Sequence, residues 1–116
     1  RGSVMSLSGF WNEFVDAFQE GLKTLAKNTV QEALDQAEAD AQAFVKDSEQ
    51  ALRRWGDALA QGKITKDDFE YLVGGQKDLA KMHALKAVGV TQARLERFRT
   101  GLISLIVSSA FDAIGL

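Results

Sequence analysis

Hydrophobic residues recur at intervals of three and four along nearly the whole chain, the spacing that places them on one face of an α-helix. The pattern predicts helices over about 8–27, 29–61, 65–88 and 91–114. Short connections between consecutive helices favour antiparallel neighbours. We therefore expect a single all-α domain over residues 4–116, folded as an antiparallel helical bundle of three to four helices.

The first predicted helix carries an aromatic stripe made of Phe10, Trp11, Phe14 and Phe18. Such a stripe packs against other helices or, in a membrane-surface protein, enters the lipid headgroup region. The polar face has the wrong sign for anionic lipid, because it holds three acids before the first base at Lys23. Packing against other helices is the favoured interpretation.

The start of the second helix is marked by Thr29 and Glu32, which have the spacing of a capping box. The helical spacing nevertheless continues through this point, so an uninterrupted first and second helix is the alternative. A helix of that length would need a second protomer to cover its line of apolar residues. The apolar seam follows a heptad-like spacing through Val30, Leu34, Ala37, Ala41, Phe44, Ser48, Leu52, Trp55 and Leu59.

The clearest boundary lies at residues 61–69. Gly62 can adopt the left-handed conformation that ends a helix. Thr65 and Asp68 have the spacing of a second capping box, and Ile64 and Phe69 stand at the positions of a hydrophobic staple. These residues predict a helical hairpin joint.

Glycines interrupt or end the predicted helices in the second half of the chain. Gly74 and Gly75 interrupt the third predicted helix, and they indicate either a kink or the close approach of a neighbouring side chain. Gly89, Val90 and Thr91 repeat the layout of the first joint, with Thr91 as the cap of the last helix.

The last helix is apolar nearly all round from Gly101 onward, so one contact surface cannot bury it. The run is shorter than the roughly 20 residues of a membrane span and contains Asp112. This surplus of apolar helix surface predicts a homodimer or a helical protein partner. The residues expected at that interface are Phe10, Trp11, Phe14, Phe18, Leu102, Ile103, Ile106, Val107, Phe111 and Ile114.

Composition and charge add few constraints. A formal net charge of -2 gives no overall attraction to nucleic acid, although residues 32–49 are acidic and residues 77–99 are basic. The chain has no cysteine, which excludes disulfides and fits a reducing compartment. Residues 1–3 have the form of an expression-tag remnant, and a cytoplasmic location is expected because no secretory signal is visible.

Residues 84–100 resemble the apolar and glycine framework of a helix-turn-helix. The resemblance implies a nucleic-acid-binding module in which Thr91 to Thr100 is the recognition helix. The side chains that would contact phosphates or base edges are Gln92, Arg94, Arg97 and Arg99. Leu85 departs from the motif, because a small residue is usual there.

No constellation of residues predicts catalysis. The calcium-loop spacing from Asp57 to Asp68 fails because Leu59 stands where a ligand is needed. His83 is the only histidine, which rules out sites built from several histidines and favours a packing role for it. The serines of the last helix lack a nucleophile elbow. We expect no enzyme activity, cofactor, metal or small-molecule substrate.

The sequence therefore predicts a non-enzymatic interaction or scaffold protein that acts through self-association or a protein partner. The first alternative is the helix-turn-helix-like nucleic-acid-binding module. The second is a lipid or membrane-surface binder, in which the apolar first and last helices open onto a hydrophobic partner.

Overall fold

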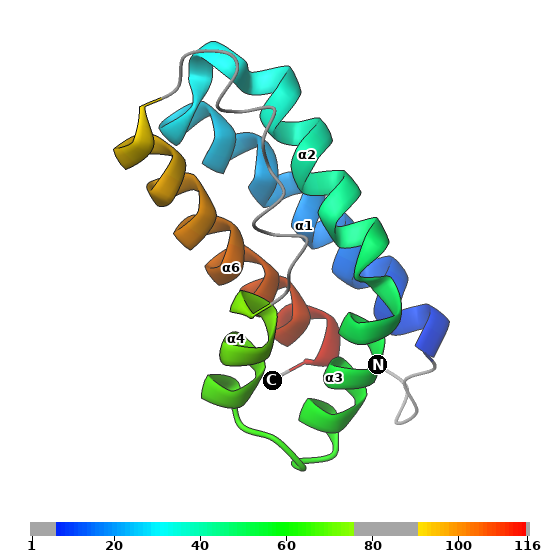
Figure 1. Cartoon of the computed structure of the whole chain (residues 1–116). Coiled ribbons are helices and arrows are strands. Elements are labelled where there is room, and N and C mark those ends of the chain that lie inside the picture. Colours follow the sequence, from blue (N-terminus) through cyan, green and yellow to red (C-terminus); the bar gives the residue numbers. More distant parts are fainter. Residues whose placement is uncertain (1–6, 76–90, 116) are drawn as a thin grey trace.

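The computed structural model describes residues 7–75 and 91–115, and within them the chain is helical, as predicted. Predictions for residues 1–3, for the third helix beyond residue 75, and for His83, Leu85, Gly89 and Val90 lie outside the described residues. The elements in chain order are α1 (Leu7–Thr29), the 3-10 turn η1 (Gln31–Ala33), α2 (Leu34–Asp47), α3 (Glu49–Ala60), α4 (Lys66–Gly74) and α6 (Gln92–Ile114) (Figure 1).

Helix α1 packs against α2, α3 and α6, whereas α4 packs against α6 and α3 (Figure 1). Helix α6 runs antiparallel to α1, since Leu105 lies on Gly21 and Leu25 lies on Gly101. Helix α2 returns antiparallel to α1 on another side, while α3 and α4 lie toward the beginning of α1. The molecule is elongated, with extents of 47 × 24 × 20 Å.

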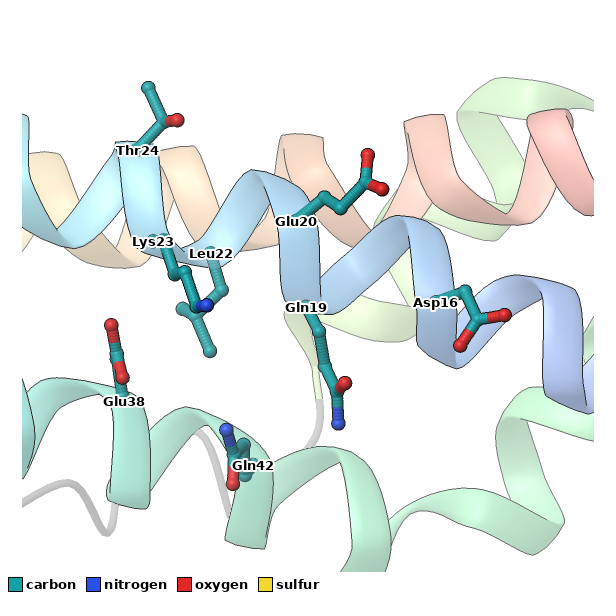
Figure 2. A pocket seen from close by; sticks show the side chains of 8 residues that line it. All are labelled: Asp16, Gln19, Glu20, Leu22, Lys23, Thr24, Glu38 and Gln42. Atoms are coloured by element: carbon teal, nitrogen blue, oxygen red, sulfur yellow. The ribbon is translucent and has the colours of Figure 1, made fainter.

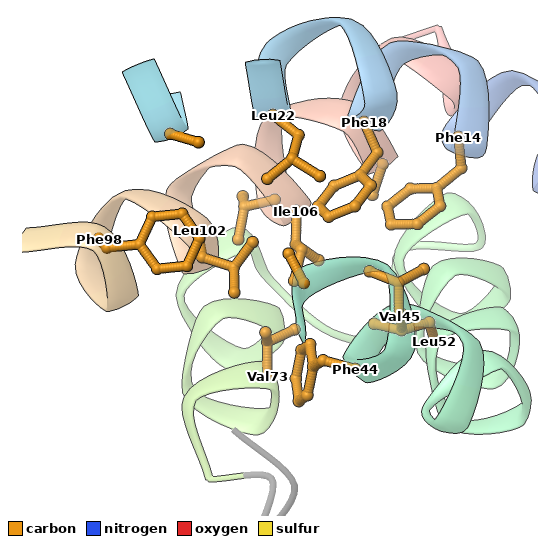
Figure 3. Close-up of a cluster of buried hydrophobic side chains, with 14 of the residues drawn as sticks. Phe14, Phe18, Leu22, Phe44, Val45, Leu52, Val73, Phe98, Leu102 and Ile106 are labelled. Carbon is orange, nitrogen blue, oxygen red and sulfur yellow. The ribbon is translucent and has the colours of Figure 1, made fainter. Parts of the chain in front are cut away.

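The core receives side chains from α1, α2, α3, α4 and α6 (Figure 3). On α1 the rings of Phe10, Phe14 and Phe18 form a stacked column, with successive centroids 6.0 Å apart. Full burial of a large apolar side chain contributes about 1.5–3 kcal/mol relative to exposure. The bulkiest side chains that are almost completely buried include Phe14, Phe18, Phe69, Phe98, Leu22, Leu52, Leu95, Leu102 and Ile106.

The turn after α1 corrects the predicted capping box. Thr29 is the last residue of α1, and its hydroxyl donates to the carbonyl of Leu25 at 2.7 Å instead of capping a following helix. Val30 precedes η1 without a side-chain cap, and it is fully buried. The chain therefore turns after Thr29, and the residue at the turn is the buried, apolar Val30 instead of a polar cap.

A break at Ser48 corrects the single helix predicted over residues 29–61. The backbone of Ser48 leaves helical geometry at φ -98 and ψ 9, although its N–H still bonds the carbonyl of Phe44. The break changes the direction of the chain so that α3 meets the beginning of α1, where Gly56 contacts Phe10. The predicted seam still faces inward on both segments, because Ala37, Ala41, Phe44, Leu52 and Leu59 are buried.

The joint at residues 61–69 has the predicted geometry. Gly62 has a positive φ of 76, and Thr65 and Asp68 form a reciprocal capping box with bonds of 3.0 and 3.1 Å. Helix α4 ends at Gly74, where a β-carbon would make only an ordinary 3.6 Å contact with Ile103. The glycine pair thus ends the helix and does not admit a close neighbour.

Candidate functional site: the groove between α1 and α2

The ten residues predicted at an interface divide into two groups. Four of them, Trp11, Ile103, Phe111 and Ile114, are half-buried and remain partly accessible. The other six are buried inside the single chain and therefore contribute no free surface in this conformation: Phe10, Phe14, Phe18, Leu102, Ile106 and Val107.

A groove runs between α1 and α2 on the surface of the described part of the chain. Its wider end has a volume of about 640 Å³. Residues spaced by three and four put its α1 wall on one face, and Glu38 and Gln42 stand one turn apart on α2. Figure 2 shows Gln19 and Lys23 directed toward α2, and Glu38 and Gln42 directed toward α1. The wall residues are Asp16, Gln19, Glu20, Leu22, Lys23, Thr24, Glu38 and Gln42.

The narrower end of the same groove has an apolar floor. It measures about 180 Å³ and adjoins the wider end through Gln19 and Gln42, which line both. Trp11, Val15 and Phe18 come from α1, and Val45 comes from α2. We refer to the two ends together as the α1–α2 groove.

Trp11 is held from two directions at this apolar end. Its ring stacks on Phe14 with centroids 5.2 Å apart, and the guanidinium carbon of Arg53 lies 5.4 Å from the ring centroid. Arg53 is in turn fixed by Glu49 at 2.7 Å. An arginine over an aromatic face gains cation–π attraction of about 0.5–1 kcal/mol at exposed sites. These contacts hold the indole of Trp11 in one position in the groove wall.

The two ends of the groove differ in charge. Asp16, Glu20 and Glu38 at the wider end make no ion pair with another described residue, and Lys23 is the single base among the residues lining that end. At the apolar end, Lys46 and Glu49 are the charged lining residues, and Glu49 is paired with Arg53. The groove therefore joins an acidic, polar end to an apolar end that has no excess of acids.

The residues predicted to contact nucleic acid start helix α6, where Thr91 caps the N-terminus by accepting from the N–H of Arg94 at 3.3 Å. Arg94 also donates from Nε to the carbonyl of Thr29 at 3.0 Å, which ties α6 to the end of α1. Glu96 pairs with Arg99 at 3.6 Å and accepts from Gln92 at 3.3 Å. Arg97 is exposed. Arg94 and Arg99 of this basic set therefore make contacts within the fold.

A second, smaller cleft of about 250 Å³ lies between α4 and α6. Lys66 stands 5.8 Å from the ring centroid of Phe111 there, and Ser104, Ser108 and Asp112 follow one another along α6. In the described part of the chain, no group of three or more His, Cys, Asp or Glu side chains is arranged to hold a metal ion. Within residues 7–75 and 91–115, no helix combines the length and apolar character needed to cross a bilayer.

The sequence shows acids on the polar face of the first helix and in residues 32–49, without showing how the two groups lie relative to one another. Sequence reasoning missed that the turn at Val30 brings these groups together on opposite walls of one groove. The available signal was the matching run of acids on consecutive helices, combined with an antiparallel turn. Comparison of the chain with protein-family models, curated proteins and solved structures found no match to any of them.

Proposed function

We propose that this protein is a non-enzymatic interaction protein that receives a segment of a protein partner in the α1–α2 groove. The observation that carries the proposal is the continuity of an apolar floor at Trp11, Val15 and Val45 with a polar end at Glu20 and Glu38. Protein-binding sites combine an apolar centre with a polar rim in this way. Tryptophan is also prominent among the residues that dominate binding energy.

A small-molecule ligand is a weaker fit to the same groove. Ligand pockets are lined mainly by apolar and aromatic side chains with a few polar groups. Seven of the eight residues that line the wider end are polar or charged, with Leu22 as the exception. The apolar end is smaller, at about 180 Å³.

Self-association is the other form of an interaction function. Self-association was predicted from a surplus of apolar helix surface. Six of the ten residues predicted at that interface are buried within one chain. Two copies docked groove to groove with the grooves parallel would place the acids of one copy against those of the other, which is unfavourable. A heterologous partner is therefore favoured over a homodimer.

The nucleic-acid and membrane-surface alternatives have less support. Arg94 and Arg99 are engaged with other groups of the fold, so Arg97 is the exposed arginine of the set. Membrane binding through the apolar terminal helices would require α1 and α6 to separate, although they are the most extensively packed pair among the described elements.

The test uses a displayed library of random peptides about 13 residues long, the length of helix that spans the groove. Gln42→Arg puts a bulky cation in the middle of the groove, and Gln50→Arg makes the same change at an exposed position of α3 outside it. Peptides selected on the unmodified protein should bind Gln50→Arg equally well and lose binding to Gln42→Arg. Failure to select any peptide, or equal binding to both variants, would count against the proposal.

A further inference from the structure

The backbone of the groove walls limits how a peptide can bind. Both walls are α-helices whose N–H and C=O groups are bonded within the helices, so they offer no edge for an added β-strand. A helix laid along the groove is the recognition mode that two helical walls favour. On α1 the groove runs from Trp11 to Thr24, about 20 Å at the rise of an α-helix.

Charge determines which helix fits. The wider end presents Asp16, Glu20 and Glu38 with Lys23 as the single base, and these acids make no ion pair with other described residues. A cationic side chain placed there gains from three carboxylates, whereas an acidic one is repelled. The apolar end instead favours bulky hydrophobic side chains against the half-buried Trp11 and Val15.

Building on the proposed function, we infer that the partner of the α1–α2 groove is a basic amphipathic helix of about three to four turns. Its bulky apolar residues contact the half-buried Trp11 and Val15, and its lysines or arginines face Glu20 and Glu38. Because Val15 and Glu20 are five positions apart on α1, the apolar and basic groups of the partner are separated by about one to two turns.

Trp11 offers a local reporter for the test. The chain has two tryptophans, and Trp55→Phe leaves Trp11 as the sole one; Trp55 is half-buried on α3 and does not line the groove. The probe is a leucine–lysine peptide with helical periodicity. One control has glutamate in place of every lysine, and a second has the same leucine and lysine content without the periodicity.

The lysine peptide should shift the emission of Trp11 and bind more weakly as salt is added. The glutamate peptide and the aperiodic peptide should bind at least tenfold more weakly. Glu20→Gln with Glu38→Gln should raise the Kd about three- to tenfold, the range expected for two exposed ion pairs. Asp47→Asn with Asp112→Asn removes the same number of charges outside the groove and should leave the Kd unchanged.

Two results would overturn the inference. The first is equal binding of the lysine and glutamate peptides. The second is a Kd for the lysine peptide that is unaffected by Glu20→Gln with Glu38→Gln or by Gln42→Arg. If library peptides bind in the groove while the lysine peptide does not, the inference fails and the proposed function stands. If no peptide distinguishes Gln42→Arg from Gln50→Arg, the proposed function itself fails.

Discussion

The ring of Phe10 lies against the backbone of Gly56, in the space that a β-carbon on residue 56 would occupy. Such a β-carbon would stand 2.5 Å from Cζ of Phe10 and 3.0 and 3.1 Å from the two neighbouring ring atoms. Phe10 is 4% exposed and begins the aromatic column of α1. This contact is what allows α3 to pack on the start of α1.

Gly56→Ala should therefore destabilise the protein. Overpacking costs about 1–3 kcal/mol, and the better helix propensity of alanine returns about 1 kcal/mol, so a net loss of up to about 2 kcal/mol is expected. The measurement is the free energy of unfolding by urea. Phe10→Leu should lose less stability in the Gly56→Ala background than in the unmodified protein. Strictly additive effects would show that residues 10 and 56 do not touch.

Gly21 and Gly101 provide the comparison for that prediction. Each contacts a leucine of the facing helix, Leu105 and Leu25 respectively, and both leucines are half-buried. A half-buried leucine can rotate away at a cost of about 0.5–1.5 kcal/mol, which offsets the gain in helix propensity. Alanine at either glycine should change the unfolding free energy by less than about 1 kcal/mol. A larger loss of stability for alanine at Gly21 or Gly101 than for alanine at Gly56 would contradict this prediction.

The joint before α4 should be sensitive at two residues. Thr65→Ala removes the acceptor for the N–H of Asp68 and should cost about 1 kcal/mol. Gly62→Val forces a β-branched residue to φ 76 and should cost about 1–3 kcal/mol. Thermal unfolding measures both effects. Thr24→Ala, at an exposed position inside α1, is the matched control and should be neutral or slightly stabilising.

Arg94 should contribute to stability where Arg97 does not. Its Nε donates to the carbonyl of Thr29, a residue 65 positions earlier in the sequence, and so joins α6 to α1. Arg94→Met should cost about 1–2 kcal/mol, because a charged donor to the last residue of α1 is lost. Arg97→Met, at an exposed position, should stay within about 0.5 kcal/mol. Equal effects in denaturant titrations would mean that the contact is not formed in solution.

Ser48→Ala should be neutral or stabilising by up to about 1 kcal/mol. The serine is 3% exposed, and its hydroxyl has no hydrogen-bond partner among the described residues. Alanine removes this unsatisfied group and is the better helix former. Calorimetric melting measures the change, with the exposed Ser104→Ala as the control for propensity alone. A clear loss of stability would indicate that the hydroxyl is bonded in solution.

The free protein should sediment as a monomer at micromolar concentration. A single chain already buries most of the apolar residues that would otherwise drive dimerisation. Sedimentation equilibrium gives the mass directly, which should match the 12.7 kDa of one chain. A stable dimer that persists on dilution would restore self-association as the interaction function.

The sequence alone determined the features that depend on neighbours along the chain. Helical periodicity gave the all-α class and the inward face of α2 and α3. The conformational freedom of Gly62 and the spacing of Thr65 and Asp68 gave the joint before α4. These were predictable because each depends on local backbone geometry and on hydrogen bonds within one turn of a helix.

Only the tertiary structure decided which surfaces meet. The sequence could not show that Gly56 accommodates the ring of Phe10, or that a break at Ser48 turns α3 toward it. It also could not show that the acids of α1 and α2 form the two walls of one groove. A periodic pattern identifies the face of a helix that is buried. The partner of that face depends on packing between residues far apart in the chain.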